Sequence, residues 1–128
     1  MKEILAIMLG GGLGATSRHG VHIFVHRFAA GNFPVGTITV NMLGSFFIGL
    51  CGALLEHYKV AAEYRLFLLT GFFGSFTTFS TFARDKAELL KVGDVKTVIV
   101  YVLTSNILGV LLVFAGYFLA QHIIESVG

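Results

Sequence analysis

Charged residues are scarce in this sequence, and their absence leaves three long gaps. Residues 28–55, 66–83 and 97–124 contain no Asp, Glu, Lys or Arg, and these gaps are 28, 18 and 28 residues long. At helical rise, each gap is long enough to cross the hydrocarbon core of a bilayer. A fourth apolar run, residues 4–28, continues past Arg18. The chain therefore divides into about four membrane-spanning helices, which leaves no room for a soluble enzyme domain.

Other residue types are scarce as well. The single cysteine, Cys51, lies in an apolar run, so there is no disulfide framework. The chain has no Trp, so Tyr and Phe must supply any aromatic belt at the membrane interface. Charged residues make up 12% of the chain, the formal net charge is +2 and the mean hydropathy is +0.84. A charge this small and scattered, without a basic stripe, excludes nucleic acid as a partner.

We predict an all-α membrane protein with a single integral membrane domain over residues 1–128. Its four transmembrane helices are expected at residues 4–28, 35–55, 66–90 and 97–124. The connections between these spans are short, and short loops place consecutive helices antiparallel and side by side.

Small residues recur at four-residue spacing in three of the spans. Gly10 and Gly14 form one such pair, and the other two are Ser45 with Gly49 and Gly116 with Ala120. This spacing favours close helix contacts where lipid supplies no hydrophobic driving force.

The positive charges do not give these helices a clear orientation. One side of the membrane receives Lys2, Lys59 and Arg65, and the other receives Arg27, Arg84, Lys86, Lys91 and Lys96. Three positive residues against five is a weak bias under the positive-inside rule. Two interpretations stay open: a single orientation with the charges in ordinary loops, or insertion both ways with pairing as an antiparallel homodimer.

The third span contains the most unusual segment, residues 71–82, with the sequence GFFGSFTTFSTF. Gly and Thr weaken helix propensity, and Ser and Thr compete for backbone hydrogen bonds. A break near residues 74–78 would leave two half-helices, the first with a carbonyl end suited to a cation. Unwound backbone at membrane depth must be buried in protein or line a cavity. The alternative is an unbroken helix whose hydroxyls bond to their own carbonyls.

Two phenylalanines beyond this segment's centre are candidates for anion contacts. Phe79 and Phe82 lie three residues apart, hence on one helix face. An aromatic ring has a positive edge, and two such edges in a dry pathway suit an anion. Ordinary core packing is the alternative explanation for both rings.

Polar side chains in the other spans are further candidates. Asn41, with Thr37 one turn before it, places an amide in hydrocarbon, where it must be paired or must serve a solute. Tyr101 and Ser105 form one turn of a polar stripe in the fourth span. Arg18 is embedded in an apolar run and suits an anion vestibule, unless it only snorkels to the interface. For the uncharged residues, interhelical hydrogen bonding is the alternative.

The missing acids narrow the class of solute. No Asp or Glu lies at the bilayer centre of any span, whereas proton-coupled exporters and cation pores need carboxylates there. No Ser-His-Asp or Cys-His arrangement is visible either, and we expect no enzyme activity. The buried polar groups favour anions or neutral solutes.

Three segments resemble the Fluc family of bacterial fluoride channels. They are residues 11–18 (GGLGATSR), 36–46 (GTITVNMLGSF) and 71–82 (GFFGSFTTFSTF). The resemblance runs along nearly the whole chain, and its third segment is the most specific.

The resemblance implies a dual-topology homodimer with two antiparallel pores that passively export F⁻ across the bacterial inner (plasma) membrane and relieve fluoride toxicity. It implies that broken third helices cross at the dimer centre, where backbone carbonyls of Gly74 and Thr77 hold a structural Na⁺. Asn41, Phe79 and Phe82 would line each pore. The implied polar track also includes Ser80, Thr81, Tyr101 and Ser105, with Arg18 beside an aqueous vestibule.

The chain departs from this family at two positions. Members commonly carry Ser and then Glu after the last Phe of the third segment, where this chain has Ala83-Arg84-Asp85. Asp85 keeps the acid but shortens it, and its role stays open. The polar stripe of the fourth span ends at Gly109. The alternative function is a small multidrug-type proton-coupled exporter, also an antiparallel dimer of four-helix chains. It requires an acid in the first span, where Glu3 is the only one, and a purely structural membrane subunit is a third option.

Overall fold

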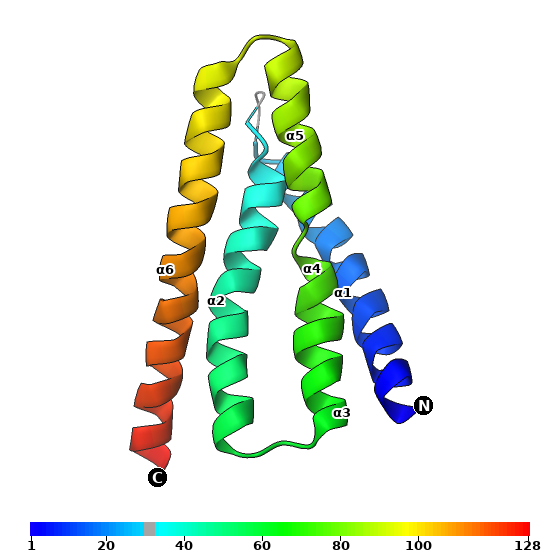
Figure 1. Ribbon diagram of the computed structural model, residues 1–128, viewed down its shortest axis with the longest axis vertical. Helices are drawn as coiled ribbons and strands as arrows, with labels where there is room; N and C mark the ends of the chain where they lie inside the picture. The colour runs from blue at the N-terminus through cyan, green and yellow to red at the C-terminus, as the bar shows by residue number, and fades with distance from the viewer. Residues whose placement is uncertain (30–32) are drawn as a thin grey trace.

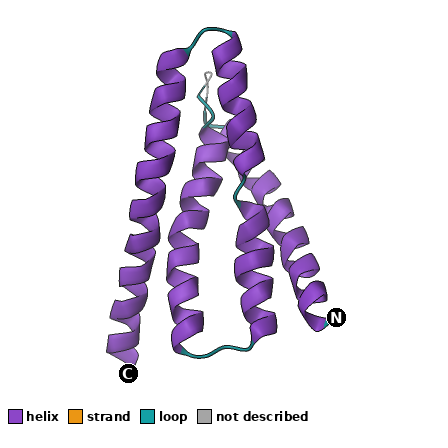
Figure 2. Cartoon of the chain, viewed as in Figure 1, coloured by secondary structure: helices purple, strands orange, loops and turns teal. Residues whose placement is uncertain are grey.

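The computed structural model describes residues 1–29 and 33–128, and all regular structure in these residues is helical. In chain order the elements are α1 (Lys2–His26), α2 (Val35–His57), α3 (Ala62–Arg65), η1 (Leu66–Phe73), α4 (Gly74–Phe76), α5 (Phe79–Lys91) and α6 (Val95–Val127). The long helices run roughly antiparallel to one another along the chain, and the two termini lie at the same end of the molecule (Figure 1; Figure 2). The prediction of an all-α protein is confirmed for this part of the chain. The connection expected between the first two spans lies partly outside the described residues.

Within residues 1–29 and 33–128, three helices are long and apolar enough to cross a membrane: α2, the interrupted helix Ala62–Lys91, and α6. They match the spans predicted at residues 35–55, 66–90 and 97–124, and the structure extends each by a few residues. Helix α1 is 25 residues long, enough for a crossing, but its Gly, His and Arg residues make it less apolar. A fourth crossing through α1 stays a prediction.

The third span is interrupted at Thr77 and Thr78, inside the range predicted from the sequence (Figure 1). The backbone of both residues is extended, with φ/ψ of −82°/157° and −146°/117°. The alternative of an unbroken helix is therefore wrong, although the hydroxyls of Ser75 and Thr77 do donate to carbonyls one turn earlier. Before the break, η1 has the wider π-helical hydrogen bonding, which often marks functional sites. No sequence pattern indicated this π-helix.

Glycines allow the closest contacts between helices. Helix α2 packs along α6, while α1 packs against η1 and α4. A Cβ atom at Gly49 or Gly116 would collide with a backbone carbonyl of the facing helix in the first pair, and the same holds for Gly10 and Gly14 in the second. Ala120, one turn after Gly116, is fully buried. The small-residue spacings therefore do lie at helix contacts.

The turn between α5 and α6 is closed by hydrogen bonds at both helix ends. Gly93 has a φ of 79°, a left-handed conformation that suits glycine. Its N–H donates to the Leu90 carbonyl at 3.0 Å, and the N–H of Asp94 donates to the Leu89 carbonyl at 2.9 Å, which forms a Schellman motif. Asp94 then caps α6 by accepting from the N–H of Thr97 at 3.2 Å. This turn folds the first half of α6 back along α5.

Most of the apolar surface of a single chain is uncovered. Only 6% of the most apolar 18-residue segment of α6 is buried within the chain. Large exposed side chains occur along this helix, among them Ile99, Leu103, Ile107, Val110, Phe114 and Phe118. Lipid or a second protein chain must cover a surface of this kind.

Candidate functional site

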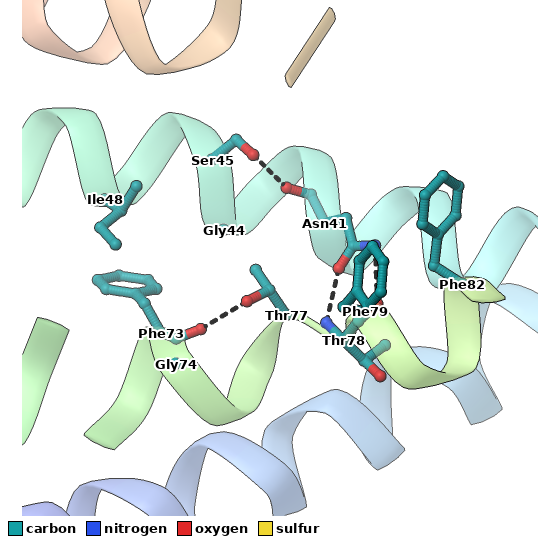
Figure 3. A pocket seen from close by; sticks show the side chains of 10 residues that line it. All are labelled: Asn41, Gly44, Ser45, Ile48, Phe73, Gly74, Thr77, Thr78, Phe79 and Phe82. Atoms are coloured by element: carbon teal, nitrogen blue, oxygen red, sulfur yellow. Dashed lines mark hydrogen bonds between the residues drawn. The ribbon is translucent and has the colours of Figure 1, made fainter. Parts of the chain in front are cut away.

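A pocket opens at the break in the third span (Figure 3). Its volume is about 300 Å³, and its walls come from α2 and from both sides of the break. The lining residues are Asn41, Gly44, Ser45, Ile48, Phe73, Gly74, Thr77, Thr78, Phe79 and Phe82. None of them is charged, and their polar side chains are one amide and three hydroxyls. Five of the ten are residues that the sequence put forward: Asn41, Gly74, Thr77, Phe79 and Phe82.

The side chain of Asn41 is bonded to the unwound backbone of Thr78. Its Oδ1 accepts from the Thr78 N–H at 2.8 Å, and its Nδ2 donates to the Thr78 carbonyl at 3.2 Å (Figure 3). One turn along α2, the hydroxyl of Ser45 donates to the backbone carbonyl of Asn41 at 2.7 Å. Both ends of the amide are therefore paired, as an amide in a hydrocarbon environment requires.

Two backbone carbonyls at the break lack the N–H donors that they would have in a continuous helix. In a continuous helix the Gly74 carbonyl accepts from the N–H of Thr78, which here donates to Asn41. The Thr77 carbonyl would accept from the N–H of Thr81, which here donates to the Thr78 hydroxyl at 3.2 Å. Carbonyl oxygens at the end of a half-helix are ligands that Na⁺ accepts in membrane proteins. The residues present therefore fit the metal expected from the sequence.

Phe79 and Phe82 form the aromatic wall of the pocket. Their ring centroids are 6.0 Å apart and the rings are tilted by 64°. Phe82 is buried, and its ring meets that of Tyr101 at 4.7 Å with an angle of 80°. Phe79, by contrast, is 76% exposed on the single chain. One ring is thus fixed by packing, whereas the other is available to a ligand or a partner chain.

Three residues after Phe82, the carboxylate of Asp85 joins α2, α5 and α6. The hydroxyl of Thr37 donates to its Oδ2 at 2.9 Å, and the Tyr101 hydroxyl donates to the same oxygen at 3.1 Å. Both hydroxyl-bearing residues are buried. Sequence reasoning singled out Thr37 and Tyr101 but left the role of Asp85 open. The available signal was its position three residues after Phe82, which places it on the same face of the helix.

The remaining predicted residues do not line the pocket. Ser80 is exposed in the first turn of α5, and Thr81 is half-buried beside it. The hydroxyl of Ser105 is buried and has no hydrogen-bond partner within residues 1–29 and 33–128. Arg18 is half-buried in α1, and its carbonyl accepts from Nδ1 of His22 at 3.0 Å. The structure does not bring Arg18 to this pocket, whose lining comes from α2 and the third span.

Several known proteins are similar to the chain over nearly its whole length. It is 41% identical over 127 residues to a protein of Parabacteroides distasonis named "Fluoride-specific ion channel FluC", which covers 99% of each sequence. A protein of the same name from Bacteroides fragilis is 44% identical over 125 residues, or 95% of this chain and 98% of the relative. Another, from Hydrogenobaculum sp., is 41% identical over 116 residues, or 90% and 94%.

The family comparison covers the same region as the structural site. Residues 5–117 match the family described as "CrcB-like protein, Camphor Resistance (CrcB)". This range contains every residue that lines the pocket, as well as Asp85 and its two hydroxyl donors. The resemblance to fluoride channels carried by the three sequence segments is confirmed by these matches. The chain therefore belongs to the CrcB family.

Proposed function

We propose that this chain forms a fluoride channel that conducts F⁻ passively out of the cell across the bacterial inner membrane. The observation that carries the proposal is the uncharged pocket between an amide and two aromatic rings, at a helix break in the span of a membrane protein. Its relatives, at about 40% identity over nearly full length, are named for fluoride conduction. The proposed activity is permeation, without any covalent step.

The groups around the pocket suit a small, strongly hydrated anion, which must exchange water for donors from the protein. The Asn41 amide nitrogen carries two hydrogens, and its bond to Thr78 uses one of them. The second hydrogen is the donor we assign to F⁻. The ring edges of Phe79 and Phe82 add positive potential on the opposite wall. The hydroxyls of Ser80 and Thr81 begin a track beyond the pocket.

The track continues along the face where α6 meets α5. The hydroxyls of Tyr101 and Thr37 donate to Asp85, and the hydroxyl of Ser105, which has no partner among the described residues, lies one turn further along α6. We assign these side chains to the path that F⁻ follows after the rings, with the Thr37 and Tyr101 hydroxyls turning from Asp85 to donate their single hydrogens to the passing anion. Arg18 lies apart from this path on α1, so its assignment is to an aqueous vestibule that attracts anions.

The proposal includes a structural Na⁺ held by the carbonyl oxygens of Gly74 and Thr77. Both oxygens have lost their helical donors, because Thr78 and Thr81 bond elsewhere. When bound, the ion neutralises the partial negative charge at the end of the first half-helix. Gly74 is exposed on the single chain, which supports a site shared between two copies.

We further propose that two chains pair as an antiparallel, dual-topology homodimer with all four spans of each chain in lipid. The exposed ring of Phe79 and the exposed backbone of Gly74 lie at the break, where a second copy would cover them. The weak charge bias of three positive residues against five is compatible with insertion in both directions.

A flux assay tests the channel function. Purified protein is reconstituted in liposomes loaded with potassium fluoride, and valinomycin carries K⁺ to balance charge. We expect rapid F⁻ efflux with little Cl⁻ flux in matched chloride-loaded vesicles. The absence of F⁻ efflux above protein-free vesicles would reject the proposal. Proton-coupled dye uptake without F⁻ flux would support the multidrug-type exporter instead.

A labelling experiment tests the orientation. Val92 is exposed in the turn after α5, so a Val92→Cys variant in a Cys51→Ser background places one thiol on one side of the membrane per orientation. In sealed vesicles, a membrane-impermeant maleimide should label about half of the chains if both orientations are equally populated. Labelling of nearly all chains or nearly none would reject dual topology.

A further inference from the structure

Lys86 lies over the faces of both rings that form the aromatic wall. Its Nζ is 4.0 Å from the ring centroid of Phe82 and 5.8 Å from that of Phe79. The side chain is half-buried in the middle of α5. Both distances are within the range of cation–π attraction, about 6 Å.

The ammonium group of Lys86 has no carboxylate partner in the part of the chain that the structure describes. The one salt bridge there joins Lys91 to Glu88 at the exposed end of α5. The neighbouring acid, Asp85, directs its Oδ2 to two hydroxyl donors instead. Lys86 therefore places a positive charge at the aromatic wall, and no ion pair with another described residue cancels that charge.

We propose that Lys86 is an anion-attracting residue of the pocket, which raises F⁻ occupancy at the ring edges of Phe79 and Phe82. This assignment rests on the proposed function as a fluoride channel. It concerns a side chain that does not line the pocket and acts through the electric field of its charge.

Two electrostatic effects support this role. A cation on the negative face of a ring is attracted by the ring quadrupole, and its field adds to the positive potential at the ring edge. An anion in contact with the edge of Phe82 would lie roughly 6 Å from Nζ, by ordinary C–H contact distances. In a partly dehydrated site, Coulomb attraction at this separation changes occupancy by about tenfold.

The charge of Lys86 also offsets the negative charge of Asp85 near the proposed anion path. Asp85 is bonded to the hydroxyl of Tyr101, whose ring contacts Phe82, and a carboxylate this close to the rings repels F⁻. The next residue along the chain, Lys86, supplies the opposite charge over the rings of Phe79 and Phe82. With Arg84 just before Asp85, residues 84–86 carry a net charge of +1, and the positive charge of Lys86 lies at the rings.

A purely structural role is the competing explanation, in which Lys86 only holds the two rings in place and snorkels toward water. The two roles differ in what the charge does. A structural clamp would limit flux at every fluoride concentration, whereas an attracting charge matters most at low concentration, before the pocket is saturated.

The test compares four variants in the liposome assay over a range of fluoride concentrations. Lys86→Gln and Lys86→Met remove the charge and keep most of the side-chain length, while Lys86→Arg keeps the charge. Lys91→Gln is the matched control, because it removes one positive charge from the same helix at a position far from the rings. Size-exclusion chromatography in detergent checks that each variant assembles like the wild type.

At low fluoride we expect Lys86→Gln and Lys86→Met to conduct about tenfold more slowly than wild type, with a smaller difference near saturation. Lys86→Arg and Lys91→Gln should conduct like the wild type at all concentrations. A Lys86→Gln flux equal to that of a conducting wild type would overturn the assignment while leaving the channel function standing. A loss that is the same at all concentrations would also overturn it. A wild type without F⁻ flux would overturn the proposed function, and this assignment with it.

If neither neutral variant assembles, the dependence of F⁻ flux on ionic strength tests the role of Lys86 instead. In an Arg18→Gln background, which removes the other charge assigned to anion attraction, added inert, impermeant salt screens the field of Lys86 at a partly exposed pocket, so F⁻ flux at low fluoride should still fall several-fold as ionic strength rises. Flux that does not respond to ionic strength would overturn the assignment.

Discussion

Asn41 and Thr78, 37 residues apart in the sequence, are joined by two hydrogen bonds between one side-chain amide and one backbone residue. The amide supplies both the acceptor and the donor that the extended backbone of Thr78 needs. A helix break in hydrocarbon has no water to satisfy such groups, and each unpaired group costs several kcal/mol. This contact therefore explains how the third span tolerates a break and keeps the pocket open.

Replacing Asn41 by Leu should destabilise the protein strongly. The change leaves both backbone groups of Thr78 unpaired, at a cost of about 2 to 4 kcal/mol from two buried polar groups. Titration with SDS in mixed micelles, followed by circular dichroism, measures the change in unfolding free energy. Asn106→Leu is the control, because the Asn106 amide is exposed and donates within its own helix, to Val102. Equal stability of the two variants would show that the two hydrogen bonds between Asn41 and Thr78 contribute nothing to the free energy of unfolding.

Replacing Asn41 by Asp separates the structural contact of Asn41 with Thr78 from its proposed contact with F⁻. A carboxylate still accepts from the Thr78 N–H but no longer donates to its carbonyl, and its charge must be desolvated, so the loss of stability should be at least about 1 to 2 kcal/mol. The added negative charge inside the pocket should abolish F⁻ flux, since it repels an anion at close range in a medium of low dielectric constant. Wild-type flux in an assembled Asn41→Asp protein would remove Asn41 from the pathway.

The sequence indicated where a break would fall but left an unbroken helix open, and it did not indicate what stabilises the break. Gly, Ser and Thr within residues 71–82 weaken a helix locally, and local weakness can be read from residue types alone. The partner of the unwound backbone is on another helix, and one sequence carries no signal that pairs Asn41 with Thr78. The same limit applies to Asp85, whose two donors lie 48 and 16 residues away. Helix existence and spacing are local properties, whereas a side-chain network depends on how the helices pack.

Exchange of either ring for an aliphatic side chain should reduce F⁻ flux. Ile is apolar but has no positive edge, so Phe79→Ile and Phe82→Ile should each lower the flux by roughly three- to tenfold, from about 0.5 to 1.5 kcal/mol per aromatic contact. Fluoride efflux from liposomes is the measurement. Phe114→Ile is the control, because Phe114 is exposed on α6 and stacks on Phe118 away from the pocket. Undiminished flux in both ring variants would count against the ring-edge role.

The Asp85 cluster should be sensitive to removal of a single hydroxyl. Tyr101→Phe keeps the ring against Phe82 and removes one of the two donors to Asp85, so we expect a loss of about 1 to 2 kcal/mol. The same SDS titration measures it. Tyr117→Phe, at an exposed position of the same helix, should leave stability unchanged. A Tyr101→Phe protein as stable as Tyr117→Phe would mean that Thr37 alone satisfies the carboxylate.

The contact between α2 and α6 should not tolerate a methyl group at Gly116. A Cβ there would collide with the Phe46 carbonyl, which is backbone and cannot rotate away. We expect Gly116→Ala to cost about 1 to 3 kcal/mol, the range typical of overpacking. Gly52→Ala is the control variant, because nothing lies within 4 Å of a Cβ at that position. The added methyl group there should only favour the helix. Equal SDS resistance of the two variants would contradict the close helix contact.

Ser105 offers a way to separate a functional polar group from a structural one. Its buried hydroxyl has no partner within the described residues, so Ser105→Ala removes no hydrogen bond from the fold and relieves an unsatisfied group. Stability should stay equal or rise by up to about 1 kcal/mol. If the hydroxyl instead serves passing F⁻, flux should fall, by about threefold for one lost donor. Ser126→Ala, which removes an exposed hydroxyl that donates to the His122 carbonyl at 2.8 Å, should leave the flux unchanged. A Ser105→Ala channel with both wild-type flux and raised stability would identify this hydroxyl as a simple packing defect, and the polar track would then end at Tyr101.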